Sequence, residues 1–378
     1  MASILNPILL VRPAVVDFGS GRAASIGAWA EERGFKRILV VSDAYNSTRI
    51  DRLGLKSEPI VFGTVKPEPD TVNLKTLLDL AEETQPDLVI GYGGGSAMDI
   101  AKLAAVLPGS GQSIHDVVGP NKVAKRKVGL IQVPTTSGTG SEAGMRALVT
   151  DPTMRTKLAV ESREMLADLA VVDPDLTLTV PPAVTASTGI DALAHCVEGY
   201  TSKRAHPTID IYALEGIRLV GQFIGRAVRN GSDSEARAGM ALASLYGGFC
   251  LGPVNTTAGH AVSYPLGTRH NIAHGLANAL IFPHVLAFNA PVVERKTKNV
   301  LQALDISQNI DADAIRAQVG AFCAGLGIDM ALSAHGVPHD DLPIMADDAA
   351  TIRRLLDFNP RDISRDDILE IYETAYFP

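Results

Sequence analysis

The chain of 378 residues contains only three cysteines, Cys196, Cys250 and Cys323, and they lie far apart in the sequence. An odd number of distant cysteines supports neither a disulfide framework nor a Cys-x-x-Cys metal site. No stretch reaches the ~18 uninterrupted apolar residues of a membrane span, and the N-terminus lacks the basic start and apolar core of a secretory signal. These absences favour a cytoplasmic protein with no membrane partner.

The sequence also lacks an excess of basic residues, because 34 lysines and arginines stand against 42 aspartates and glutamates, for a net charge of −8. Nucleic-acid binding needs a concentrated basic surface, so no nucleic acid is expected as a partner. The hydrophobic fraction of 46% and the charged fraction of 20% are typical of a well-packed globular protein. A chain of this length is expected to form two domains.

The first half of the chain alternates short β-branched runs with segments of helical periodicity. RILVVSD, PIVFG, DLVIGYGGG and GLIQVPTT are predicted to be strands of a parallel sheet with helices on both faces. After VVDPDLTLTVPP the strand signals stop, and long amphipathic helical stretches follow. We therefore expect an α/β domain over residues 1–180 and an all-helical domain over residues 181–378, divided near the Pro181–Pro182 pair.

One strand-loop-helix segment has the features of a phosphate site. DLVIGYGGGSAMDIAKLAAVL is read as a buried strand, a run of three glycines and a helix with Ser96 at its N-cap. Glycines let a phosphate approach the backbone, and a helix N-terminus offers free N–H groups and a positive dipole end. A second loop, PTTSGTGSE (Pro134–Glu142), follows another strand. Two such loops at one sheet edge predict a dinucleotide crevice.

A third glycine motif is a weaker candidate. Gly19, Gly21 and Ala24 in GSGRAA match the G-x-G-x-x-A fingerprint, with Asp43 roughly 20 residues further on. Because the strand AVVDF before them is short, we interpret these glycines as turn residues. Asp43 ends the strand RILVVSD, where an acid can bind the adenosine ribose hydroxyls and repel a 2′-phosphate. A role as a turn or helix-capping aspartate is the alternative.

Asp191 and His195 lie four residues apart in GIDALAHCVEG, so on a helix both side chains project from the same face. On its own, such a pair is more often a surface contact or a buried hydrogen bond. His260 and His274, in HAVSYPLGTRHNIAH, strengthen the case for a metal. Three imidazoles and one carboxylate would form a site suited to Fe(II) or Zn(II), with room for a substrate oxygen.

Taken in order, the motifs of nearly the whole chain resemble those of the iron-containing, or group III, alcohol dehydrogenase family. The resemblance rests on GGGSAMDIAK, VPTTSGTGSE, VVDPDL, TGIDALAHCVEGY, GHAVSYPLG and AHGLANALIFPHV. It implies an N-terminal Rossmann-like domain that binds NAD(P) and a C-terminal helical domain that binds the metal, an architecture shared with dehydroquinate synthase. The active site would lie in the cleft between them, and a homodimer would be ordinary for the family.

The resemblance also implies roles for individual residues. The four metal ligands would be Asp191, His195, His260 and His274. Asp43 matches the family position that favours NAD over NADP. The other cofactor contacts would be Gly94, Gly95, Ser96, Asp99, Thr135, Thr136, Thr139, Leu176 and the ribose-contacting Lys157.

The chain departs from the family pattern near the reacting groups. Tyr264 stands where many members carry a histidine, Gly144 and Arg146 stand where threonine and phenylalanine are frequent, and Glu68 replaces the asparagine of a PNP segment. We hypothesise that His270 relays the proton, through Tyr264 or water, because an imidazole titrates near neutral pH and a phenol does not. A solvent-exposed loop histidine is the alternative.

The sequence therefore predicts a metal-dependent, NAD-dependent enzyme that interconverts a small alcohol and an aldehyde or ketone by hydride transfer. NAD is expected rather than NADP, and Fe(II) is expected, with Zn(II) as the alternative. A maleylacetate-reductase-like or hydroxyacid-oxoacid-transhydrogenase-like enzyme is a rival, in which Arg146 would bind a substrate carboxylate. A lyase resembling dehydroquinate synthase is a second rival, but it would need a basic pocket, and residues 255–275 offer only Arg269.

Overall fold

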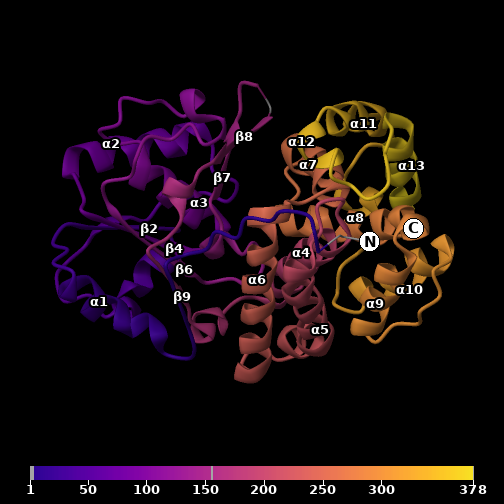
Figure 1. The fold of residues 1–378 in the computed structure, drawn as a ribbon, viewed down its shortest axis with the longest axis horizontal. Helices are drawn as coiled ribbons and strands as arrows, with labels where there is room; N and C mark the ends of the chain where they lie inside the picture. Colours follow the sequence, from indigo (N-terminus) through magenta and orange to yellow (C-terminus); the bar gives the residue numbers. More distant parts are fainter. Residues whose placement is uncertain (1–3, 155, 378) are drawn as a thin grey trace. The chain divides into compact units, whose positions relative to one another are not determined.

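The computed structural model describes residues 4–154 and 156–377, so the expected domain ends at residues 1 and 378 lie outside the described residues. The described chain forms two compact units (Figure 1). The α/β unit comprises Leu10–Thr136 and Gly140–Leu178. The helical unit comprises the described residues up to Leu9, the segment Ser137–Thr139 and the chain from Thr179 onward. The chain thus crosses between units inside the PTTSGTGSE loop as well as after Leu178.

The α/β unit is built on a six-stranded parallel sheet in the order β1-β9-β6-β4-β2-β3. The predicted parallel sheet is confirmed, and all four predicted runs form strands of it. The strands are β1 (Val15–Phe18), β2 (Ile38–Ser42), β3 (Ile60–Phe62), β4 (Leu88–Gly93), β6 (Gly129–Pro134) and β9 (Leu169–Val172).

Helices cover both faces of this sheet. In β2, Leu39 and Val41 pack into the core formed with α2 (Thr71–Thr84) and α3 (Gly95–Val106). The alternate residues of β2, Ile38 and Val40, pack into the opposite core with α1 (Ile26–Glu32). Two-sided burial explains why these strands are continuous apolar runs in the sequence.

A small three-stranded sheet in the same unit was not predicted. Its order is β5-β8-β7, and β7 and β8 are antiparallel. The strands are β5 (Gly119–Pro120), β7 (Arg146–Asp151) and β8 (Thr156–Glu161). Only every second residue of β7 is buried, so its apolar signal is weaker than that of the central strands.

From Thr179 onward the described chain is helical, as predicted. The helices are α4 (Pro182–Thr201), α5 (Pro207–Arg229), α6 (Ser234–Val254), α7 (Ala258–His270), α8 (His274–Asn289), α9 (Glu294–Ala303), α10 (Ala312–Ala324), α11 (Leu342–Ala350), α12 (Arg353–Leu356) and α13 (Arg365–Tyr376). Helix α4 begins at Pro182, where the missing N–H of proline costs nothing. All three cysteines are free and buried.

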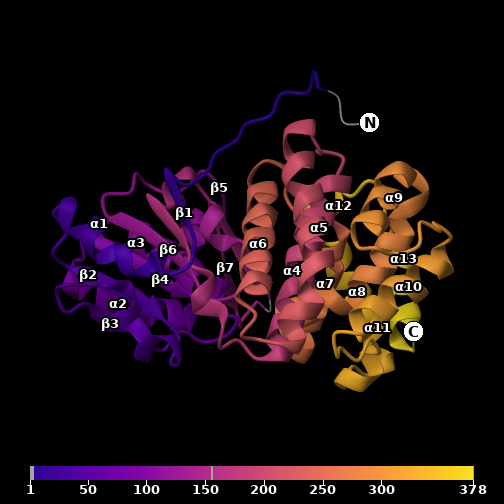
Figure 2. The same ribbon diagram turned by 90° about the horizontal axis from the view of Figure 1, so that it is seen from below.

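Helices α4, α5 and α6 pack side by side (Figure 2). Gly247 of α6 allows a close approach to α4, because a Cβ atom there would lie 3.1 Å from Cβ of His195. Among the described residues, the segment His274–Val292, which begins with α8, is long and apolar enough to cross a membrane by length and composition. However, 72% of its most apolar 18-residue window is buried inside the structure, as in a core helix.

Candidate metal centre and nucleotide-binding loops

Four side chains from three helices meet inside the helical unit. The Nε2 atoms of the three histidines lie near Oδ1 of Asp191, at 3.9 Å for His195, 3.5 Å for His260 and 3.6 Å for His274. Asp191 and His195 come from α4, His260 from α7, and His274 is the first residue of α8. The first three are almost completely buried, whereas 25% of the His274 side chain is exposed. The structure thus brings together the four residues singled out as ligands.

The electrostatics of this cluster attract a cation. Burial alone would raise the pKa of Asp191, but His195, His274 and His260 hold that pKa below its usual value. Burial would lower the pKa of His260, but the Glu198 and Asp191 carboxylates raise it to about 10. Burial lowers the pKa of His195 to about 4. The donor set of imidazole nitrogens around a carboxylate oxygen fits a divalent transition metal.

Glu198 is a polar partner of this cluster that the sequence did not single out. Its carboxylate contacts Nδ1 of His260 and also accepts hydrogen bonds from the N–H group (2.9 Å) and the hydroxyl (3.0 Å) of Thr257. Nδ1 of His195 instead lies 3.3 Å from the carbonyl oxygen of Gly138. Glu198 lies seven residues after Asp191 on α4, and this spacing on one helical face is the signal that could have identified it.

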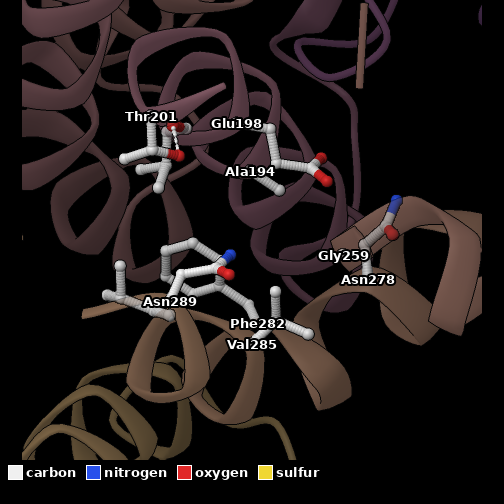
Figure 3. Close-up of a pocket in the computed structure, with 10 residues that line it drawn as sticks. Ala194, Glu198, Thr201, Gly259, Asn278, Phe282, Val285 and Asn289 are labelled. Atoms are coloured by element: carbon white, nitrogen blue, oxygen red, sulfur yellow. Dashed lines mark hydrogen bonds between the residues drawn. The ribbon is translucent and has the colours of Figure 1, made fainter. Parts of the chain in front are cut away.

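Asn278 is a second partner that the sequence did not reveal. Its Nδ2 atom lies 2.6 Å from Oδ1 of Asp191 and 3.2 Å from Nε2 of both His260 and His274. Asn278 follows His274 by four residues on α8, so helical spacing again explains its position. Beside it lies a cavity of about 20 Å³, which has room for one water molecule. Glu198 and Asn278 line this cavity together with apolar side chains of α8 such as Phe282 (Figure 3).

The two residues expected in the proton relay have different surroundings. The ring centroid of Tyr264 lies 6.0 Å from that of His274, and the Arg354 guanidinium carbon lies 5.7 Å from the Tyr264 ring. His270 is the last residue of α7, and its Nε2 lies 3.5 Å from Oδ2 of Asp341. Only 12% of its side chain is exposed. The alternative interpretation of His270 as a solvent-exposed loop residue is therefore wrong.

The first glycine loop leads into α3 two residues earlier than predicted. The N-cap residue is Gly94, in an extended conformation, and the helix starts at Gly95. The prediction that Ser96 is the N-cap is therefore wrong. Ser96 lies in the first turn of the helix, where its Oγ accepts a hydrogen bond from the N–H of Glu68 at 3.3 Å. A run of three glycines leaves the start of a helix ambiguous, because none of them offers a capping side chain.

Asp43 has the turn-capping role that was the alternative to ribose binding. Its Oδ1 accepts hydrogen bonds from the N–H groups of Tyr45 and Asn46, both at 2.9 Å. Its Oδ2 accepts the Asn46 side-chain amide at 2.7 Å, and the same amide lies 3.2 Å from Oγ1 of Thr135. A carboxylate oxygen can accept more than one hydrogen bond, so this role leaves ribose binding as a prediction.

The remaining candidate cofactor residues have different surroundings. Thr136 lies against the first glycine loop, since a Cβ atom on Gly94 would be 3.5 Å from its Oγ1. Asp99 instead joins elements within the α/β unit, because its carboxylate accepts hydrogen bonds from the Ser141 hydroxyl and the Leu148 N–H. Leu176 is buried in the core on the α1 side of the sheet, and Thr139 belongs to the segment that groups with the helical unit.

Two of the residues that depart from the family pattern, Glu68 and Arg146, form ion pairs. Lys157, the expected ribose contact, pairs with Glu68. Arg146 pairs with Glu161, with Nη2 and Oε2 2.7 Å apart. Both pairs lie within the α/β unit. Lys157 was expected to contact the ribose, and Arg146 was expected to bind a substrate carboxylate in one rival reaction. Both side chains already contact carboxylates of this chain.

The GSGRAA loop binds a carboxylate of its own chain. Asp173 accepts hydrogen bonds from the N–H groups of Gly21 (3.1 Å) and Ala23 (2.9 Å). Gly21 has a φ of 73°, a left-handed conformation that favours glycine. The interpretation of these glycines as turn residues is consistent with both observations.

Comparison with known proteins agrees with this arrangement. Residues 13–174 match the family described as iron-containing alcohol dehydrogenase, and residues 185–376 match the C-terminal part of the same family. The chain is 36% identical to long-chain-alcohol dehydrogenase 1 of Geobacillus thermodenitrificans, over 97% of this chain and 96% of that protein.

Solved structures agree in fold over almost the whole chain. A 1,3-propanediol oxidoreductase superposes with a TM-score of 0.91 at 29% identity, covering 98% of this chain and 100% of that one. A sulfoacetaldehyde reductase from Bifidobacterium kashiwanohense in complex with NAD+ superposes with a TM-score of 0.88 at 28% identity, covering 98% and 99%. The chain therefore belongs to the iron-containing alcohol dehydrogenase family and is an oxidoreductase that acts on CH–OH groups.

Proposed function

We propose that this chain is an NAD-dependent alcohol dehydrogenase in which Asp191, His195, His260 and His274 hold Fe(II). The observation that carries the proposal is the convergence of four N/O donors, from three helices, in the interior of the helical unit. Zn(II) is the alternative metal, because the same donor set suits it. The likeness to a solved relative bound to NAD+ supports NAD as the cofactor.

Each group has a defined part in the proposed reaction. When bound, the metal would polarise the substrate oxygen as a Lewis acid, and NAD would exchange a hydride with the substrate carbon. His274 is the most exposed of the four ligands, so we place the substrate on its side. Tyr264 lies beside His274 and would face the substrate hydroxyl. His270, next to Asp341, would pass the proton to water.

The nucleotide would bind at the two loops of the α/β unit. In this proposal Gly94, Gly95 and Ser96 contact the pyrophosphate, because α3 starts there with its positive dipole end. The Asp43 carboxylate would accept hydrogen bonds from the adenosine ribose hydroxyls and would repel a 2′-phosphate. The further contacts would be Thr135, Thr136, Thr139 and Lys157. We likewise propose residues 1–180 as the nucleotide domain, residues 181–378 as the metal domain, and a cytoplasmic homodimer as the working form.

The two rival reactions have less support. A carboxylate substrate would need the charge of Arg146, but that guanidinium is paired with Glu161. A dehydroquinate-synthase-like lyase would need basic side chains near the metal, but Arg269 is paired with Asp348. Both pairings favour an uncharged alcohol as the substrate.

A substrate screen tests the proposal. The purified chain is loaded with Fe(II) without oxygen and mixed with NAD or NADP and a panel of alcohols, diols and hydroxy acids, while the absorbance of the reduced cofactor is followed. We expect reduced cofactor to accumulate with NAD and an uncharged alcohol, and not after removal of the metal with a chelator. Turnover of hydroxy acids alone would favour the first rival. Activity with no accumulation of reduced cofactor would favour a lyase.

A further inference from the structure

Glu198 is a buried carboxylate that faces a candidate metal ligand. It is only 5% exposed, and its carboxylate contacts Nδ1 of His260. The same carboxylate accepts hydrogen bonds from the N–H groups of Thr257 and His260, at 2.9 and 3.3 Å. These two groups belong to the first turn of α7, of which Thr257 is the N-cap residue. The hydrogen bonds fix the position of the Glu198 carboxylate, and the positive end of the helix dipole stabilises its negative charge.

This contact determines which nitrogen of His260 faces the ligand cluster. An ionised carboxylate only accepts hydrogen bonds, so Nδ1 of His260 must carry the hydrogen atom. Nε2 is then directed at His195 and Asp191, at 2.9 and 3.5 Å. The Nδ1 atom of His195 has the neutral carbonyl oxygen of Gly138 as its partner instead. His260 is thus the histidine held by a full negative charge.

The charges of the site balance only if Glu198 is included. The three imidazoles are neutral when they bind a metal, and Asp191 contributes a single negative charge. A divalent ion would then leave a buried net charge of about one unit, which is unfavourable in the protein interior. The carboxylate of Glu198 supplies the second negative charge.

Space for this carboxylate depends on the lack of a side chain at Gly259. A Cβ atom on Gly259 would lie 3.0 Å from Oε1 and 3.2 Å from Cδ of Glu198. In Figure 3 the Glu198 carboxylate points away from Thr201, toward the end of the cavity at which Gly259 and Asn278 lie. Adding a methyl group at Gly259 would therefore displace the carboxylate without removing it.

We propose that Glu198 is a positioning residue of the metal centre, which orients His260 through its Nδ1 and neutralises the second charge of the divalent ion. This inference rests on the proposed metal site. Carboxylates that hold a ligating histidine typically change metal affinity by about 10- to 100-fold when they are removed. We expect a loss of this size for Glu198→Gln, which keeps the shape of the side chain, and a smaller loss for Gly259→Ala.

The test measures metal binding directly. Wild type, Glu198→Gln, Gly259→Ala and Asp191→Ala are titrated with Co(II) in competition with a chelator, and the visible spectrum of bound Co(II) reports its coordination. Asp210→Asn is the matched control, because it removes a half-buried carboxylate of the same unit that pairs with Lys296. Thermal unfolding and NAD affinity report whether each variant is folded, and we expect both to stay close to the wild-type values.

The outcomes separate this inference from the proposed function. If Asp191→Ala loses Co(II), Glu198→Gln and Gly259→Ala bind it more weakly with a changed spectrum, and Asp210→Asn matches wild type, the inference is supported. If Asp191→Ala loses Co(II) but Glu198→Gln and Gly259→Ala bind it within twofold of wild type, the inference is overturned and the metal site stands. If Asp191→Ala binds Co(II) like wild type, the proposed metal site itself is wrong.

Discussion

The Nε2 atoms of His195 and His260 lie 2.9 Å apart in the interior of the helical unit, and the two rings stack with their centroids 4.6 Å apart. Two such nitrogens cannot both direct a hydrogen atom at each other. At least one therefore offers a lone pair toward the space shared with Asp191 and His274. A cation bound in this space would replace the crowded contact between the two rings.

We therefore predict that His260→Ala loses metal and turnover together. Removal of one of four ligands leaves an incomplete donor set, so metal content measured after desalting should fall well below one equivalent. The rate of alcohol oxidation should fall in proportion. His339→Ala removes an exposed histidine that pairs with Glu373 and serves as the control. A His260→Ala protein that keeps one equivalent of metal and the wild-type rate would contradict the ligand assignment.

We predict that the charge of Asp43 makes the enzyme prefer NAD over NADP. Repulsion between its carboxylate and a 2′-phosphate is worth about 1–4 kcal/mol, so removal of the charge should narrow the ratio of kcat/KM for NAD to kcat/KM for NADP by about fivefold or more. Asp43→Asn is the sharper variant, since it keeps an acceptor for the N–H groups of Tyr45 and Asn46. Asp43→Gly also removes this turn cap, so the two variants separate charge from local structure. A wild-type preference for NADP would show that Asp43 has another role.

The sequence predicted the elements in which neighbouring residues share the same surroundings, because a uniform environment leaves a regular pattern in the sequence. The runs in β2 and β4 are apolar throughout because helices cover both faces of the sheet. The ligand pair on α4 was predictable because four residues make about one helical turn. Strands β7 and β8 were missed because a half-buried pair in a small sheet has a weaker apolar pattern.

Contacts between distant segments could not be predicted. Glu198 contacts His260, which lies 62 residues further along the chain, and the packing of both α4 and α7 against α8 brings them together. The pairing of Lys157 with Glu68 likewise joins β8 to the loop before α2. Neither pair has a local signal in the sequence, although helical spacing places Glu198 on the same face as Asp191.

We predict that Glu142 makes the stability of the protein depend on pH. Burial raises the pKa of Glu142 from 4.5 to about 7, and its Oε2 has no hydrogen-bond partner among the described residues. Between these two values the folded state keeps a proton that the unfolded state releases, so this contribution to stability is present at acidic pH and lost as the pH rises through 7. A shift of this size corresponds to about 3 kcal/mol.

Glu142→Gln stays uncharged at every pH, so it should gain stability relative to wild type as the pH rises. Thermal unfolding at pH 5 and pH 8 measures this, and the difference in Tm between variant and wild type should be larger at pH 8. Asp151→Asn, at another buried carboxylate of the same unit, is the control. An equal Tm difference at both pH values would show that Glu142 is ionised throughout this range in the folded protein.

The last prediction concerns the proton that leaves during alcohol oxidation. Tyr264 lies beside His274, and His270 lies two turns later on α7 with Asp341 next to its Nε2. If His270 relays the proton, His270→Ala should lower kcat/KM by about 100-fold, the lower end of the usual range for acid-base groups. The pH dependence contributed by the imidazole should disappear. Tyr264→Phe should lower the rate while keeping that pH dependence, because the imidazole remains.

The experiment is a pH profile of kcat/KM for the three proteins, with metal content measured in each. If His270→Ala keeps its metal and reproduces the wild-type profile, His270 has no part in the relay, and its contact with Asp341 serves only to join α7 to α11.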